Sequence, residues 1–323
     1  MISAPLLAVH LLAMNLACVL PLHACWLAGR EGTPQQANRF SPRQVAWHSL
    51  LALVLGCLLG GLQYWLGEDS LREAWSRLPA RAYRFALSEL AFSAACIGWL
   101  MFLFPPISGG IELTRKRSAL AWILAVLSSS NLLYHFPSLM SVLGKLTANP
   151  SWSRLEQLPR KELLLLMKQP DILAISVHFA MASVAVALVY VLWLFASEWS
   201  HEDLQHSGRM LAGVALLISL LQFGVGVWLL ASLPAESRDR LLGGDMIAAI
   251  AFGGGIFSTL LLCGSLANIA LGKVTQADSR KAAMWTVVTV LLMTVALKGI
   301  RSAKATVEQK EPRQKTATAR LVS

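Results

Sequence analysis

Hydrophobic residues along this chain fall into long blocks that few polar positions interrupt. Eight blocks reach the length of about 20 apolar residues that a membrane-spanning helix needs. They cover roughly 4–28, 44–66, 83–104, 118–143, 171–197, 208–232, 244–272 and 282–299. The pattern therefore predicts an all-α fold, a polytopic membrane helical bundle of about eight transmembrane helices.

The segments between the blocks add two further helices to this prediction. Residues 69–84 are charged, and residues 152–168 carry leucines along one face, so both are expected to be amphipathic helices at the membrane surface. Residues 1–300 are expected to form the bundle, and the basic residues 301–323 a disordered tail. The first block has no basic leader and is too long for a signal sequence, which favours a retained helix.

Composition narrows the class of protein further. The chain of 323 residues is 55% hydrophobic and only 14% charged, with a mean hydropathy of +0.56. Soluble domains carry about 25% charged residues, so a soluble enzyme is excluded. The net charge of +10 resides mostly in loops and tail, so it indicates a membrane surface and lipid contact, and no nucleic acid is expected as a partner.

The same charges bear on topology. An even number of spans places both termini on one side of the membrane. The basic residues from Lys298 to Arg320 favour the cytoplasm for that side. Without this tail, the basic residues of the loops on the two sides are nearly equal in number.

The cysteines indicate what chemistry the chain lacks. None of the five forms a CxxC or CxxCH pattern, so no zinc ribbon, disulfide framework or covalent c-type haem is expected. All lie inside apolar blocks and are interpreted as small buried residues. The five are Cys18, Cys25, Cys57, Cys96 and Cys263.

Four ionisable residues inside the predicted spans are the strongest functional candidates, because such groups are costly in a membrane. They are His10, Glu89, His135 and His178. Counted along helices that alternate in direction, all four fall at a similar depth in the leaflet on the side of the N-terminus. His23 and His48 fall near the opposite side.

Neutral imidazole is the commonest axial ligand of haem iron, and a nearby carboxylate can ligate high-spin iron or carry a proton. A single membrane histidine more often bonds a neighbouring helix, so each residue alone leaves both readings open. The four together favour a cofactor or proton site. Asn131 and Gln222 are interpreted as hydrogen bonds between helices, and Gly253 to Gly255 as a point of close helix packing.

Over about residues 4–200, these segments resemble subunit I of the cytochrome bd quinol oxidases. The segment VHLLAMNLACVLPLHACWLAGR is similar to that family's first helix, with His10 at the haem-binding histidine. ALSELAFSAACIGWLMF is similar to its third helix, with Glu89 at the haem-site glutamate. In NLLYHFP, His135 replaces the family's glutamine. QPDILAISVHF keeps the proline spacing before the low-spin haem ligand, at His178.

The resemblance implies a divergent, shortened membrane b-type cytochrome of the bacterial inner membrane, with one or more haem b groups and haem d left open. His10 would bind a high-spin haem, with Glu89 as the candidate catalytic residue. His178 would bind a low-spin haem b. Its second ligand would be His135 or a late methionine such as Met246 or Met284.

The resemblance also implies partners: a second membrane subunit and a quinol or c-type cytochrome as electron donor. It would place the side of both termini in the periplasm, which opposes the count of basic residues. The family's large quinol-binding loop is absent, because residues 234–243 form only a short turn. Whether the chain is an oxidase therefore stays open. The alternatives are a haem-free transporter and an anchor subunit of a redox complex.

Overall fold

The computed structural model describes residues 3–29, 41–66, 69–104, 114–148, 158–196 and 202–302, and these contain helices and no strand. Eight of the helices are long and apolar enough to cross a membrane, which confirms the predicted all-α polytopic bundle. The eight are α1 (Ser3–Ala28), α2 (Pro42–Leu66), α4 (Ala80–Leu103), α5 (Arg115–Ala148), α7 (Pro170–Leu194), α8 (Glu202–Ser232), α10 (Met246–Leu271) and α11 (Gln276–Ser302).

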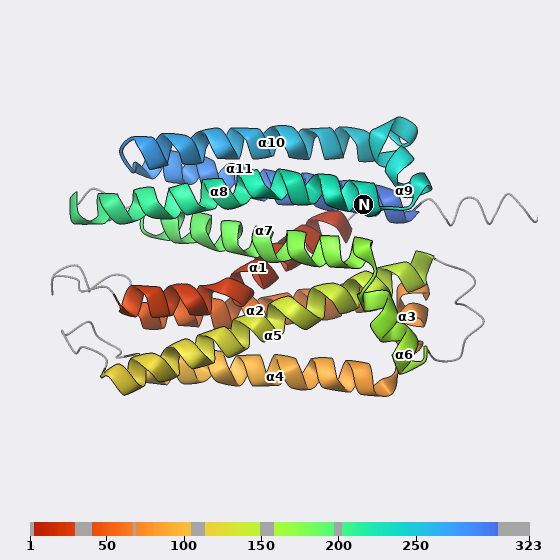
Figure 1. Cartoon of the computed structure of the whole chain (residues 1–323), viewed down its shortest axis with the longest axis horizontal. Helices are drawn as coiled ribbons and strands as arrows, with labels where there is room; N and C mark the ends of the chain where they lie inside the picture. The colour runs from red at the N-terminus through yellow and green to blue at the C-terminus, as the bar shows by residue number, and fades with distance from the viewer. Residues whose placement is uncertain are drawn as a thin grey trace, which may run out of the picture.

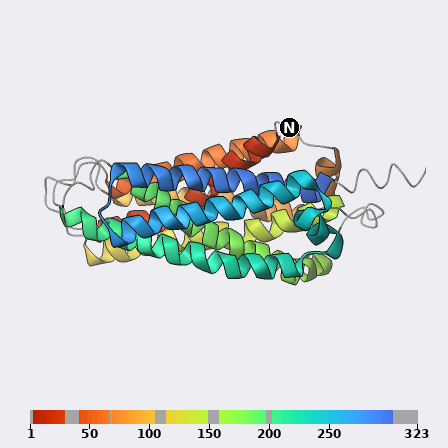
Figure 2. The same cartoon turned by 90° about the horizontal axis from the view of Figure 1, so that it is seen from above.

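The long helices form two groups of four. One group holds α1, α2, α4 and α5, and the other holds α7, α8, α10 and α11 (Figure 1). The long helices other than α1 run roughly along the long axis in both Figure 1 and Figure 2. A helix satisfies all its backbone hydrogen bonds internally, which is why apolar segments in lipid adopt it.

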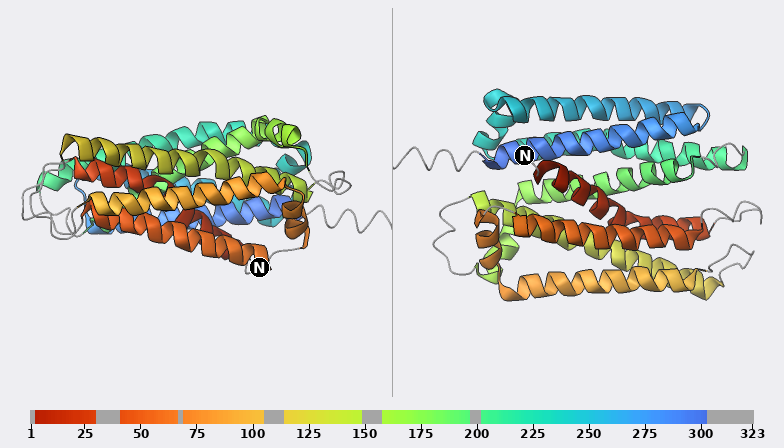
Figure 3. Two further views of the ribbon diagram at one scale, coloured as in Figure 1. Left: turned by 90° about the horizontal axis from the view of Figure 1, so that it is seen from below. Right: turned by 180° about the vertical axis from the view of Figure 1, so that it is seen from behind.

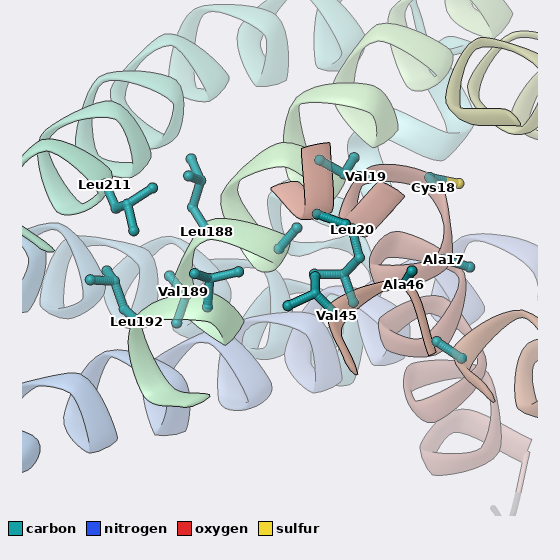
Figure 4. Close-up of a cluster of buried hydrophobic side chains, with 14 of the residues drawn as sticks. Ala17, Cys18, Val19, Leu20, Val45, Ala46, Leu188, Val189, Leu192 and Leu211 are labelled. Atoms are coloured by element: carbon teal, nitrogen blue, oxygen red, sulfur yellow. The ribbon is translucent and has the colours of Figure 1, made fainter. Parts of the chain in front are cut away.

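Helix α1 joins the two groups. It crosses the bundle obliquely, beginning beside α11 and continuing beside α2 (Figure 3). Its buried Leu20 lies close to Val45 of α2, while Leu188 and Leu192 of α7 approach Leu211 of α8 (Figure 4). This central core is continuous across both groups, so the spans form one packed body.

Both the beginning of α1 and the end of α11 lie at one end of the bundle, here called end A; the opposite end is end B (Figure 1). This is the arrangement that eight antiparallel spans require. The last residues of α1, α4, α7 and α10 and the first residues of α2, α5, α8 and α11 lie at end B (Figure 1). Helix α11 extends to Ser302, and the rest of the predicted disordered tail lies outside the described residues.

Two short helices cover the first group at end A, namely α3 (Asp69–Ser76) and α6 (Arg160–Met167). They pack over a second apolar cluster that includes Leu78, Leu143 and Ile172. The predicted amphipathic segment 69–84 is thus two elements, because Pro79 interrupts the helix before α4. Of the other predicted segment, 152–168, residues 152–157 lie outside the described residues.

The connection from α8 to α10 is short, as the sequence predicts. It consists of α9 (Ala235–Asp239) and a π-helical turn (Arg240–Gly244). Gly243 has φ of 135° there, a backbone conformation that side chains disfavour.

Candidate functional site

Glu89 and His135 meet between α4 and α5. The carboxylate Oε2 lies 3.9 Å from the imidazole Nδ1, and the two side chains are only 14% and 17% exposed. The ring of Phe85 meets that of His135 edge-on, with centroids 5.4 Å apart. The sequence places His135 near the end of a helix closing at residue 143. The helix instead continues to Ala148. The contact between the two side chains places His135 level with Glu89, as the depth inferred from the sequence implies.

Asn131 anchors this pair from α5. Its Nδ2 donates to the backbone oxygen of Glu89 at 2.9 Å and to Oγ of Ser93 at 2.8 Å. The predicted hydrogen bond between helices is therefore confirmed. Among the described residues, Oε2 of Glu89 is buried without a hydrogen-bond partner. An unpartnered buried oxygen is costly, so this carboxyl group is suited to hold a proton or meet a ligand.

His10 lies between α1 and α2. Its Nδ1 donates to the backbone oxygen of Gly56 at 2.8 Å, which leaves Nε2 as the basic nitrogen. A Cβ at Gly60 would lie 3.1 Å from Cε1 of His10, and one at Gly56 would lie 2.5 Å from Sδ of Met14. The His10 ring thus packs closely against the bare backbone of Gly60, and the Met14 side chain packs against that of Gly56.

His178 lies on α7. Its Nδ1 is buried and has no hydrogen-bond partner among the described residues. Nε2 of Gln222 on α8 donates to the backbone oxygen of His178 at 3.3 Å, which confirms the predicted contact between helices. The ring itself therefore has a nitrogen in the protein interior that nothing described satisfies.

The direction of the His178 side chain follows from the contacts of its neighbours. Ser176 contacts Ser138 of α5 at 3.0 Å, and Ser183 donates to Asn15 of α1 at 2.8 Å. At about 100° per residue, His178 is turned by about 160° from Ser176 and about 140° from Ser183. Its side chain thus points away from α1 and α5, towards the interior of the second group of helices.

The structure therefore distributes the four candidates over three places. Glu89 and His135 form a pair, His10 lies on the α2 side of α1, and His178 lies on the far side of α7. Among the described residues, no group of three or more His, Cys, Asp or Glu could hold a metal ion. The late methionines Met246 and Met284 are 74% and 49% exposed, so neither is a buried partner for His178.

His10 and His178 still share one level in the bundle. The Asn15–Ser183 hydrogen bond links two helices that run in the same direction from end A (Figure 1). His10 precedes Asn15 by five residues, and His178 precedes Ser183 by five. Each histidine therefore lies about 7.5 Å closer to end A than this hydrogen bond. The depth inferred from the sequence agrees with this placement, whereas the faces on which the side chains lie could not be inferred.

Two polar residues were not identified from the sequence, Gln63 and Tyr190. Nε2 of Gln63 is buried without a described partner, one turn after Gly60. Towards end B, Nδ1 of His48 lies 3.3 Å from the hydroxyl of Tyr190. Gln63 could have been found as a single amide within an apolar block. The contact of Tyr190 with His48 leaves no local pattern in the sequence that would predict it.

Comparison with known proteins gives no match: the chain matches no family model, no curated protein and no solved structure. The eight apolar helices therefore identify the chain as a multi-pass helical membrane protein that contacts lipid.

Proposed function

We propose that this protein is a membrane b-type cytochrome, an electron-transfer subunit similar to subunit I of the bd oxidases. The observation that supports this best is the pair of part-buried histidines at one level, on α1 and α7. Nδ1 of His10 donates to the Gly56 carbonyl, which leaves its Nε2 as the basic nitrogen, and Nδ1 of His178 is buried without a hydrogen-bond partner among the described residues. Since the two side chains lie on opposite sides of the α1–α7 contact, the proposal is two haem b sites, one for each histidine.

The surroundings of His10 fit an axial ligand. Histidine ligands commonly donate their second ring nitrogen to a carbonyl, which fixes the tautomer and the ring plane. The Gly56 carbonyl accepts from Nδ1 in this way, and Gly60 leaves room for the ring. His10 would therefore present Nε2 to the iron. A bound haem supplies a one-electron couple that the side chains lack.

His178 would serve the second site, within the group formed by α7, α8, α10 and α11. Its unpartnered Nδ1 is the kind of buried polar atom that a ligand or an ordered water normally satisfies. The His135 alternative for its second axial ligand is not retained, because His178 points away from α5.

The Glu89–His135 pair would handle protons. The carboxyl and imidazole groups are close enough that a proton bound by one is shared with the other through a small movement. A proton taken up there would offset the charge of an electron that arrives nearby in a medium of low dielectric constant. The proposal also includes an electron donor, either a quinol or a c-type cytochrome, and a second membrane subunit. It places the protein in the bacterial inner membrane and includes reduction of oxygen.

The test is the haem content of the purified protein, measured as the pyridine haemochrome together with the protein concentration. We expect two haem b per chain, and loss of about one in each of His10→Ala and His178→Ala. His206→Ala is the matched control, because His206 is exposed at the beginning of α8 and should lose none. Preparations without a Soret band would refute the proposal.

A second candidate is a haem-free, proton-coupled transporter, and the buried Glu89–His135 pair favours it. Such a pair can bind and release a proton without any cofactor. This candidate predicts no haem, together with proton flux in vesicles that Glu89→Gln abolishes and Glu162→Gln, at an exposed site on α6, leaves intact. Haem in the wild-type protein with no flux would exclude it.

A further inference from the structure

Helix α6 is fixed firmly across end A. Its Leu163 and Leu166 are buried in the cluster that also contains Leu143 and Ile172. Just before the helix, the backbone N–H of Leu158 donates to the backbone oxygen of Arg77 at 2.8 Å. The orientation of α6 is therefore set by packing, and its opposite side is a defined surface.

That opposite side combines lysines with leucines. Lys161 precedes Leu163 by two residues and Lys168 follows Leu166 by two, which turns both about 160° from the buried leucines. Leu164 and Leu165 lie on either side of these lysines and are 48% and 58% exposed. We call Lys161, Leu164, Leu165 and Lys168 the outer face of α6.

The charges of the outer face have no ion-pair partner among the described residues. These charges are Lys161 and Lys168, and Glu162 is the one carboxylate of the helix. Lys145 nearby shows the contrast: its Nζ lies 2.7 Å from Asp171 and it also donates to Gln169. Among the described residues, this cation is thus paired, and the two of the outer face are exposed and have no ion-pair partner.

We infer that the outer face of α6 binds the headgroups of anionic phospholipids in the leaflet at end A. Leucines beside lysines are the pattern of a helix that lies in the interface, with leucines among the upper acyl carbons and ammonium groups at the phosphates. Because the buried leucines on the opposite side already hold α6 in place, the helix does not have to become ordered when a lipid binds. Anionic lipid is the favoured occupant because the exposed charge is positive and the neighbouring element is a membrane-spanning bundle.

The experiment uses the full-length protein in a neutral detergent. Phosphatidylglycerol is titrated while bound lipid is counted by native mass spectrometry and the thermal midpoint is followed. We expect phosphatidylglycerol to bind and raise the midpoint, while phosphatidylcholine and inorganic phosphate do neither. Lys161→Gln with Lys168→Gln should weaken binding about fivefold for each lysine, and Leu164→Ser with Leu165→Ser should weaken it further.

The matched control removes two exposed cations at end B, with Lys116→Gln and Arg117→Gln. It should retain the wild-type response. Equal binding of phosphatidylcholine, equal loss in the control, or loss of a co-purifying protein instead of lipid from the lysine variant would each overturn the inference. If the double variant fails to fold, Lys168→Gln alone tests it, since this residue follows the last helical turn and is exposed.

Discussion

Replacing Asn131 by alanine tests the packing that positions Glu89. The change removes two hydrogen bonds between α5 and α4, at 2.9 Å to the Glu89 backbone oxygen and 2.8 Å to Oγ of Ser93. Polar contacts between membrane helices average about 0.6 kcal/mol and reach about 1.7. We therefore expect Asn131→Ala to lower the free energy of unfolding by about 1 kcal/mol, with about 3 as the upper bound.

The assay is reversible unfolding in mixed micelles, followed by circular dichroism. Ser130→Ala is the matched control, because this exposed hydroxyl bonds only within its own helix; its effect should stay within about 0.5 kcal/mol. A double-mutant cycle with Ser93→Ala should give a coupling of about 0.6 kcal/mol. The reasoning is refuted if the two single variants at 130 and 131 lose the same stability, or if that coupling is zero.

Three further predictions concern packing, exposure and topology. Gly299→Ala should destabilise by about 1–3 kcal/mol in the same assay, because the new Cβ would lie 2.6 Å from Cβ of Ala248; Gly264→Ala, with open space around it, should not. Four of the five cysteines are buried, but Cys57 is exposed, so the interpretation of all five as buried was wrong for this residue. A lipid-soluble maleimide should label Cys57 before Cys18, as read by peptide mass spectrometry; equal labelling would contradict the packing of α1. Reporter tags before α1 and after α11 should indicate the same side of the membrane, whichever side that is.

The spans were predictable because the bilayer imposes a length that sequence reveals directly. Their ends were less predictable. The apolar block containing His135 stops near residue 143, yet α5 continues to Ala148. Lys145, which follows the apolar block, forms an ion pair with Asp171 of α7. Tertiary contacts of this kind extend a helix beyond its apolar run.

The candidate residues were predictable by type and depth but not by direction. Helices α1 and α7 are apolar on all sides, so their pattern does not distinguish the face towards one neighbour from that towards another. His10 turns to α2 because its Nδ1 donates to Gly56, which is distant in sequence. His178 turns away from α5 because its neighbour Ser176 contacts Ser138, which is also distant in sequence. The common depth of the four residues suggested one shared site, but their side chains lie in separate places.

The reduced-minus-oxidised absorption spectrum of the purified membrane protein tests the central proposal most directly. The account predicts the α and Soret bands of haem b in the wild type, a reduced signal in His10→Ala and in His178→Ala, and no signal when both are replaced. A stable, folded wild-type protein with no difference bands would contradict it, as would full bands in the double variant.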